Sequence, residues 1–241
     1  MDNYIFAYYQ KIKDGSIVVG KWVTLLYENI VSGIENGTYI FNQQKANRAI
    51  KFIETFCRHN KGKLAPRPLK LSLWEKAFIS CIYGIVDESD KRVFREIALF
   101  VGRKCGKTLL ASAIMAYEVY VDGEFGSEIY CVAPKLDQSD LVFSAFEFTK
   151  DKNPDLAKRT RKRKNDYIID STNTTIKKIA FNEKNVEDIF AIHYPEEWKK
   201  KHILLVDDVI TSGSTMFSCI KHTTPIRGCR VSVFSLGWAH K

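Results

Sequence analysis

The sequence predicts an α/β fold in which helices come first and a parallel sheet follows. Apolar side chains recur at helical spacing through residues 1–60, which indicates amphipathic helices. Residues 95–133 have the pattern of a strand, a glycine-containing loop, a helix and a second strand, the unit from which parallel sheets are built. An apolar strand at 201–206 is followed in a similar order by a loop with glycine, a helix and a last strand at 230–234.

Glycine, proline and short polar stretches mark the boundaries between the elements. Residues 60–68 are rich in such residues and separate the N-terminal helices from a helix predicted at 71–85. The short apolar run at 95–100 is predicted to be a buried strand, and the helix after the loop is expected at 107–120. The remaining elements are strands at 128–133, 166–170, 175–181 and 201–206, a helix from Thr215 and the strand at 230–234.

Composition excludes several classes of protein. The chain is 45% hydrophobic and 27% charged, as soluble globular proteins are, and no apolar run approaches the roughly 20 residues that cross a bilayer. The first residues lack the basic and apolar regions of a secretory signal, and the cysteines show no CxxC spacing. We therefore expect a reduced, cytoplasmic protein without a membrane partner.

The charge of the chain suits a polyanionic partner. The formal net charge is +9, and the run 158–164 alone contains six lysines and arginines. Such runs bind nucleic acid through its phosphates, but they also occur as solvated loops. Contact with double-stranded DNA at 158–164 and a plain basic loop are both open interpretations.

A glycine-containing loop lies between the strand at 95–100 and the helix at 107–120. It comprises Gly102, Arg103, Lys104, Cys105, Gly106, Lys107 and Thr108. A triphosphate needs N–H donors at a helix N-terminus, a cation near its β and γ phosphates and an oxygen ligand for Mg²⁺. Lys107 supplies the cation and Thr108 the metal ligand, so the loop is predicted to bind a nucleoside triphosphate with Mg²⁺. An ordinary glycine-containing turn is the alternative. The standard spacing would place the first glycine at Val101, one residue before Gly102.

The loop resembles the deviant Walker A loop of the large terminase subunit of tailed phages. In that family an arginine sits inside the loop, as Arg103 does, and the first glycine is often missing. Upstream, residues 71–78 look like the adenine-recognition segment, which includes Trp74 and Glu75. Glu75 stands where a glutamine often stands, and a carboxylate cannot donate to adenine N7. The resemblance covers about residues 1–184 and implies a P-loop NTPase sheet after the N-terminal helices.

The terminase resemblance implies ATP-driven DNA packaging in the cytoplasm of a host cell. Lys107 and Thr108 would hold the phosphates and Mg²⁺, Arg103 would sense the γ phosphate, and the other loop residues would surround the nucleotide. Double-stranded DNA, a small terminase subunit and a portal are the partners that the family implies. The family's Asp-Glu strand, coupling motif and nuclease domain do not follow in recognisable form before Lys241, so we expect an ATPase core truncated before the nuclease.

A second motif begins at the end of the strand at 201–206. Two carboxylates are followed by a loop of small residues: Asp207, Asp208, Thr211, Ser212, Gly213, Ser214 and Thr215. Paired carboxylates accept hydrogen bonds from ribose hydroxyls, and a hydroxyl-rich loop opening a helix donates to a phosphate. The motif resembles the signature of type I phosphoribosyltransferases, and its flanks at 185–190 and 231–236 are similar to the ComF branch. This resemblance implies a Rossmann-like unit over 185–241 that binds phosphoribosyl diphosphate.

The same carboxylates also fit a Walker B strand. Asp207 would then bind Mg²⁺ through water, and Asp208 would stand where the water-orienting glutamate belongs. The pyrophosphate loop of the phosphoribosyltransferases has no counterpart upstream, so a complete transferase is not expected. The two resemblances each stop where the other starts, near 182–186, which favours a chimera of two families.

Three hypotheses therefore remain. The chain is a terminase-type ATPase with Arg103, Lys107 and Asp208 as catalytic residues, a ComF-like phosphoribosyltransferase, or a non-catalytic DNA-binding module. The first predicts a helical region at 1–66, an ATPase core of terminase type at 67–184 and a phosphoribosyltransferase-like segment at 185–241.

Overall fold

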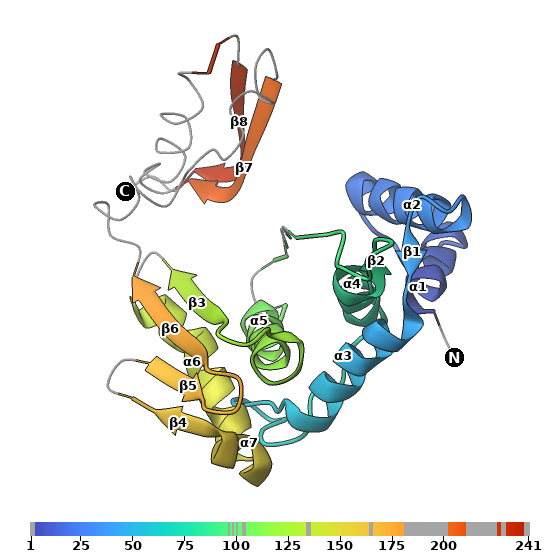
Figure 1. Ribbon diagram of the computed structural model, residues 1–241. Coiled ribbons are helices and arrows are strands. Elements are labelled where there is room, and N and C mark those ends of the chain that lie inside the picture. The colour runs from blue at the N-terminus through green and yellow to red at the C-terminus, as the bar shows by residue number, and fades with distance from the viewer. Residues whose placement is uncertain are drawn as a thin grey trace. The chain divides into compact units, whose positions relative to one another are not determined.

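The computed structural model describes most of the chain, which divides into two compact units. The described residues are 3–95, 97, 99, 101–102, 105–133, 136–163, 166–180, 202–210, 226–227 and 230–238. The first unit comprises Met1–Cys131 and Asp140–Lys177, and the second comprises Val132–Ser139 and Lys178–Lys241. Figure 1 labels the helices and strands.

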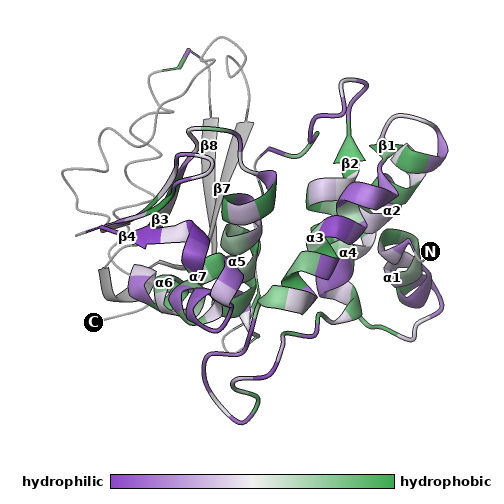
Figure 2. Cartoon of the chain, turned by 60° about the horizontal axis from the view of Figure 1, so that its bottom comes forward, coloured by the Kyte–Doolittle hydropathy of each residue, from purple (hydrophilic) through white to green (hydrophobic). Residues whose placement is uncertain are grey.

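Helices form the N-terminal part of the first unit, as the sequence predicts. They are α1 (Tyr4–Lys13), α2 (Lys21–Glu35), α3 (Gln43–Phe56) and α4 (Leu73–Gly84), and α4 packs against both α1 and α3. Buried residues such as Ile5, Tyr27 and Cys81 join α1, α2 and α4 in one hydrophobic cluster. A short pair of antiparallel strands, β1 (Ile40–Phe41) and β2 (Ile85–Val86), completes this part. Figure 2 shows hydrophobic and hydrophilic residues side by side on α2 and α3, as amphipathic helices require.

Asparagine side chains fix where two of these helices begin. The side-chain oxygen of Asn3 accepts from the amide groups two and three residues later, at 3.1 and 3.4 Å. Asn42 does the same at the start of α3, with both distances 3.1 Å. Such caps satisfy amide groups that have no partner inside the helix and contribute about 1 kcal/mol each.

A second hydrophobic cluster surrounds the helix that follows the glycine-containing loop. This helix, α5 (Lys107–Tyr117), confirms the predicted position and continues into a π-helix, η1 (Glu118–Asp122). The cluster also receives side chains from α3, from α4 and from α6 (Leu136–Asp151). Its aromatic rings lie edge to face at Tyr83–Tyr117 and Phe52–Tyr117, with centroids 4.7 and 5.6 Å apart. No helix in the described part of the chain has the length and apolarity that a bilayer crossing needs.

The main sheet has four strands, and its order is β3-β6-β5-β4. The strands are β3 (Glu128–Ala133), β4 (Thr160–Lys162), β5 (Asp166–Ile169) and β6 (Thr174–Ala180), and α7 (Pro154–Arg159) precedes β4. The strands β5 and β6 confirm those predicted at 166–170 and 175–181. Both β4–β5 and β5–β6 are antiparallel, so this sheet is not wholly parallel, as the predicted P-loop sheet would be. The reason is the four-residue connection before β6, where Asn173 has a φ of 52°, because so short a link can join only antiparallel strands.

The strand predicted at 95–100 is not found among its described residues. Arg95, Ile97 and Leu99 lie outside any strand, and Ile97 and Leu99 are 46% and 37% exposed. The apolar run predicted burial, but a strand also needs a pairing neighbour, which a local pattern cannot supply. The prediction of a buried strand is therefore wrong for these three residues.

The second unit contains β7 (His202–Ile210) and β8 (Arg230–Trp238), which pair in parallel. Parallel pairing is what the predicted strand-loop-helix-strand order requires. The helix predicted from Thr215 and the flank at 185–190 lie outside the described residues. The strand β7 is longer than predicted, because it runs through Asp207 and Asp208 as far as Ile210. The two carboxylate residues are therefore inside the strand and not beyond its end.

Candidate nucleotide-binding site

The predicted phosphate loop ends at the first turn of α5. Gly106, the residue before the helix, has a φ of 76°, in the left-handed region that favours glycine. A Cβ on Gly106 would meet nothing within 4 Å, so backbone conformation and not lack of space selects glycine here. The Gly106 carbonyl accepts from the N–H groups of Leu109 and Leu110, both at 3.0 Å, which closes the first turn.

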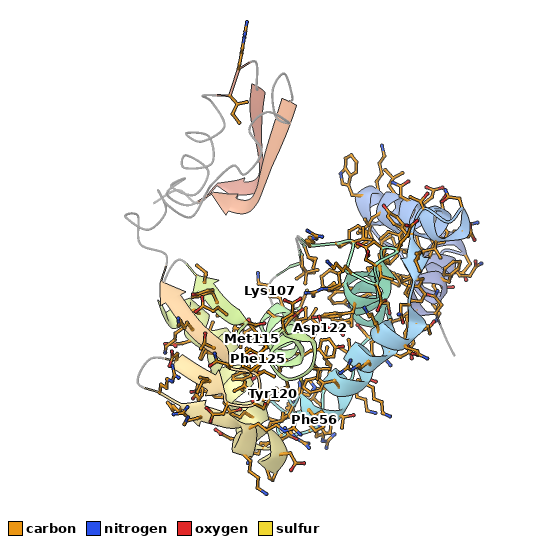
Figure 3. The ribbon with its side chains drawn as sticks, viewed as in Figure 1. Phe56, Lys107, Met115, Tyr120, Asp122 and Phe125 are labelled. Carbon is orange, nitrogen blue, oxygen red and sulfur yellow. The ribbon has the colours of Figure 1, made fainter. Side chains whose placement is uncertain are left out.

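The start of α5 offers donors and a positive charge to solvent. The first amide groups of a helix have no partner within it, and the helix dipole makes this end positive. Lys107 is exposed and Thr108 is half-buried, whereas Leu110 and Met115 farther along are buried in the core. Figure 3 shows Lys107 at the end of α5 and Met115 within it. A firmly packed helix thus presents its N-terminus as an anion-binding end.

The rest of the loop is only partly described. Gly102 is exposed, and a Cβ there would lie 3.6 Å from Sγ of Cys105, an ordinary van der Waals contact. The φ of Gly102 is not positive. Neither space nor conformation among the described residues requires glycine at this position, in keeping with the departure from standard spacing. Arg103 and Lys104 lie outside the described residues.

The residues predicted to recognise adenine have structural roles at the start of α4. The backbone N–H and the hydroxyl of Ser72 both donate to Oε2 of Glu75, at 2.8 and 2.7 Å. This arrangement is a capping box, in which the Glu75 carboxylate stabilises the first turn. Trp74 is half-buried and packs against both hydrophobic clusters of the first unit.

A charged network joins the segment before the loop to the end of the helix after it. Arg92 Nη1 lies 2.5 Å from Oε1 of Glu118 and 3.6 Å from Oδ2 of Asp122. The hydroxyl of buried Tyr83 donates to the same Glu118 oxygen at 2.9 Å, and the Arg92 guanidinium lies over the Tyr83 ring, 5.4 Å from its centroid. Burial and the Glu118 carboxylate raise the pKa of Tyr83. Burial opposes the charge of Arg92, but Glu118 and Asp122 outweigh it and raise the Arg92 pKa.

The π-helix η1 places both carboxylates of this network. A π-helical turn is rare and occurs often at functional sites. It ends at Gly123, whose N–H donates to the Glu118 carbonyl at 2.7 Å, and a Cβ on Gly123 would come within 2.6 Å of that oxygen. Glycine is therefore required by the close approach of the backbone. The network lines a surface pocket of about 510 Å³ together with Lys45 and Arg95.

The second predicted motif belongs to the second unit. In β7, Asp207 is the Cα partner of Ser235 in β8. Its predicted loop at 211–215 lies outside the described residues. Elsewhere, no group of three or more His, Cys, Asp or Glu residues suited to a metal ion occurs among the residues that the structure describes.

Known proteins match the segment that contains this site. Residues 73–190 match the family model for the terminase large subunit, ATPase domain. This segment is similar to a terminase ATPase domain. The terminase-like segment begins with α4 and contains the network, the loop, α5 and the four-stranded sheet.

A sequence match and a structural match, both to the large terminase of one phage, show how far the similarity extends. The large terminase subunit of Enterobacteria phage HK97 is 32% identical over 101 residues, which are 42% of this chain and 19% of that protein. The crystal structure of the HK97 bacteriophage large terminase has a similar fold, with a TM-score of 0.51 at 19% identity over 81% of this chain and 37% of that chain. In both comparisons the chain spans less than two fifths of the length of the protein that it matches. None of these matches supports the ComF-like resemblance of residues 185–241 or a chimera.

Sequence reasoning missed the charged network beside the terminase-like loop. Arg92 and Glu118 are 26 positions apart, and no periodicity or motif relates them. The one available signal was Gly123, a glycine directly after an apolar helix, which marks a helix end but not a π-helix.

Proposed function

We propose that the chain is the ATP-binding and ATP-hydrolysing core of a DNA-packaging terminase large subunit. The observation that carries this proposal is the start of α5, where left-handed Gly106 precedes exposed Lys107 inside the terminase-like segment. Backbone amide groups there donate to phosphate oxygens, Lys107 neutralises the β and γ phosphates, and Arg103 pairs with the γ phosphate. Gly102, Lys104 and Cys105 complete the loop.

The loop also suits a magnesium ion bound with the nucleotide. Mg²⁺ prefers oxygen ligands, and the Thr108 hydroxyl at the first turn of α5 is one. The ion draws negative charge from the β and γ phosphates during phosphoryl transfer. The Walker B hypothesis adds Asp207 as a ligand through water and Asp208 as the residue that orients the attacking water. A shorter carboxylate than glutamate at this position predicts slow hydrolysis.

Calorimetric titration with Mg-ATP tests the proposal. Lys107→Ala removes the cation that faces the phosphates, so binding should be lost. Lys21→Ala is a matched control, because Lys21 is also exposed and also follows a glycine at the first turn of a helix. We expect unchanged binding in the control. If the wild type does not bind Mg-ATP, or if Lys107→Ala binds it equally well, the proposal is wrong; loss in Asp207→Asn would support the Walker B role.

The partners follow from the same proposal. Double-stranded DNA is the cargo, and the run 158–164 contacts it, while a small terminase subunit and a portal complete the packaging assembly. Of this run, Lys158, Arg159 and residues 161–163 are exposed, which the contact requires.

A second candidate function is binding of phosphoribosyl diphosphate through Asp207, Asp208 and residues 211–215. The observation that favours it is the parallel pairing of β7 with β8, as in a strand-loop-helix-strand unit. Titration with phosphoribosyl diphosphate separates the two candidates. Binding of this ligand alone, lost in Asp207→Asn and kept in Lys107→Ala, would transfer the function to the C-terminal motif.

A further inference from the structure

The connection between α3 and α4 is strongly basic. This basic loop, residues 57–70, contains five lysines and arginines and no acidic residue. Lys61, Lys63 and Arg67 are all exposed. The sequence pattern singled out this stretch only as a breaker-rich boundary, and the ATP-binding proposal makes no use of it.

The basic loop has a defined conformation. His59 N–H donates to the Arg67 carbonyl at 3.0 Å, and Leu69 N–H donates to the Cys57 carbonyl at 2.8 Å. Cys57 and Leu69, at the two ends, are 1% and 6% exposed, so both ends are fixed in the core. A loop held in this way presents its charges with little ordering cost on binding.

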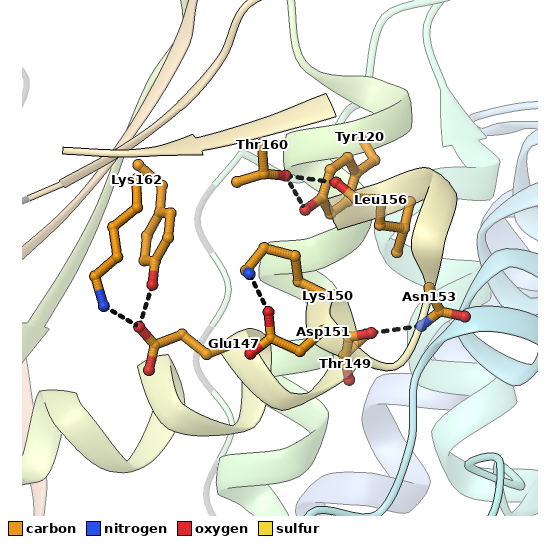
Figure 4. A network of polar contacts seen from close by, with 10 residues as sticks. Tyr120, Glu147, Thr149, Lys150, Asp151, Asn153, Leu156, Thr160 and Lys162 are labelled. Carbon is orange, nitrogen blue, oxygen red and sulfur yellow. Dashed lines mark hydrogen bonds and ion pairs between the residues drawn. The ribbon is translucent and has the colours of Figure 1, made fainter. Parts of the chain in front are cut away.

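The basic loop lies beside α6 and α7. Arg58 N–H donates to the Thr149 hydroxyl at 3.3 Å, and the Asn153 amide donates to the Phe56 carbonyl at 2.9 Å. Asn153 is itself only 8% exposed and precedes the first residue of α7. Figure 1 shows α7 leading into β4, and Figure 4 shows Thr149 and Asn153 on the α6–α7 side of this junction. Two segments that are about 90 positions apart in the chain thus meet at one surface.

The net positive charge of this surface exceeds the net charge of the whole chain. Residues 57–70 and 149–163 contain twelve lysines and arginines against two carboxylates, whereas the formal net charge of the chain is +9. Three of the cations are paired: Lys150 with Asp151, Arg161 with Asp170, and Lys162 with Glu147 (Figure 4 shows the first and third). The other nine form no ion pair within the described part of the chain. Eight of these nine are exposed: Lys61, Lys63, Arg67, Lys70, Lys152, Lys158, Arg159 and Arg163.

We infer that the basic loop, α7 and β4 together form a docking surface for the phosphate backbone of double-stranded DNA. Exposed cations distributed over rigid elements match a repeating array of phosphates, which bind through charge without regard to sequence. A membrane surface is less suited, because peripheral helices that bind it bury a broad apolar face, and Leu64 is the one large exposed apolar residue of the basic loop. The inference rests on the proposal that the chain acts on DNA and extends the contact beyond residues 158–164.

Fluorescence anisotropy with labelled 20-base-pair duplexes of two unrelated sequences, measured over a range of salt concentrations, tests the surface. The full chain is compared with Lys61→Ala/Lys63→Ala/Arg67→Ala. The logarithm of the DNA-binding constant falls as the logarithm of the salt concentration rises, and each lost phosphate contact makes this slope shallower by about 0.9. The triple variant should therefore make it shallower by about 2 to 3 for both duplexes. Lys158→Ala/Arg159→Ala should make the salt slope shallower by about 2.

A matched control removes the same charge elsewhere. Lys11→Ala/Lys13→Ala/Lys51→Ala takes three exposed lysines from α1 and α3, and its salt slope should equal that of the wild type. If the salt slope becomes equally shallow in this control, or stays unchanged in the basic-loop variant, the assignment of this surface is wrong, although DNA remains the partner. If the wild type binds neither duplex, the surface and the DNA partner both fail. Binding to anionic vesicles without binding to duplex would reassign the surface to a membrane, and Mg-ATP binding stays a separate test.

Discussion

Arg92 Nη1 lies 2.5 Å from Oε1 of Glu118, and this contact joins the segment that enters the glycine-containing loop to the π-helix that follows α5. The two residues are 26 positions apart, and the whole loop lies between them. Closing a chain segment at its base reduces the conformational freedom of everything inside it. The contact therefore stabilises the loop from outside the residues that would touch a nucleotide.

Replacing Arg92 by glutamine tests this anchor. The change removes the charged partner of Glu118, and because Arg92 is partly exposed we expect a loss of about 1 kcal/mol in the free energy of unfolding. Mg-ATP binding should weaken as well, since the base of the loop is held less firmly. Urea unfolding and calorimetry measure the two effects. Arg95→Gln removes an exposed arginine from the same segment and should change neither, so equal effects in both variants would rule out an anchoring role for Arg92.

Gly106→Ala should destabilise the protein through backbone conformation alone. An alanine at a φ of 76° costs about 1 kcal/mol or more, and no neighbouring atom lies within 4 Å of the added Cβ. Gly20→Ala is the matched control, because Gly20 also precedes a helix and has equal space around it, but its φ is −70°. Alanine is a poorer N-cap than glycine, but it also restricts the unfolded chain, so we expect a net loss of only a few tenths of a kcal/mol there. Thermal unfolding of the two variants tests this prediction. Similar decreases in the unfolding temperature would show that the φ of Gly106 does not cause the loss of stability.

The helices could be predicted from the sequence because each one carries its own signal. Apolar spacing placed the helices at 1–60, 71–85 and 107–120, and the asparagines that cap α1 and α3 stand directly before them. The arrangement of the strands could not be predicted in the same way. Strand pairing is a relation between distant segments, so the apolar run at 95–100 indicated a strand without indicating a neighbour for it.

The same distinction between local and long-range features applies to the candidate site. Gly106, Lys107 and Thr108 are adjacent in the chain, so their spacing alone predicted a helix N-terminus with a cation and a hydroxyl. The contact between Arg92 and Glu118 exists only because α4, α5 and η1 pack together, and no local pattern records it. Glu75 shows the reverse case, because its place in a family motif suggested a ligand contact while its own neighbour Ser72 uses the carboxylate as a cap.

Glu75 should be tolerant of glutamine and sensitive to alanine. A glutamine side chain keeps an oxygen that accepts from the Ser72 amide, so Glu75→Gln should lower stability by about 0.5 kcal/mol or less. Glu75→Ala removes the acceptor and should cost about 1 kcal/mol. Urea unfolding compares them. A loss of Mg-ATP affinity in Glu75→Gln without any loss of stability would contradict a purely structural role for this carboxylate.

Two buried thiols predict a loss of stability at alkaline pH. Burial raises the pKa of Cys57 from 9.0 to about 12, and burial likewise raises the pKa of Cys81 to about 12, partly offset by a hydrogen bond with Tyr27. Above pH 9 the unfolded thiols release protons while the folded ones keep them. The stabilisation is therefore complete below pH 9 and is lost as the pH rises from 9 to 12, by at most about 1.4 kcal/mol per pH unit for each thiol.

Urea unfolding at pH 8, 9, 10 and 11 measures this decline. In Cys57→Ala one of the two groups is absent, so the free energy of unfolding should start lower at pH 8, because a buried side chain is shortened, and then fall less steeply. Cys105→Ala is the control, because Cys105 is exposed, and its curve should run parallel to that of the wild type. If the Cys57→Ala curve also runs parallel to the wild type, the burial of this thiol does not govern the alkaline transition, and ionisation of buried tyrosines such as Tyr120, whose pKa burial raises to about 12, becomes the cause to test.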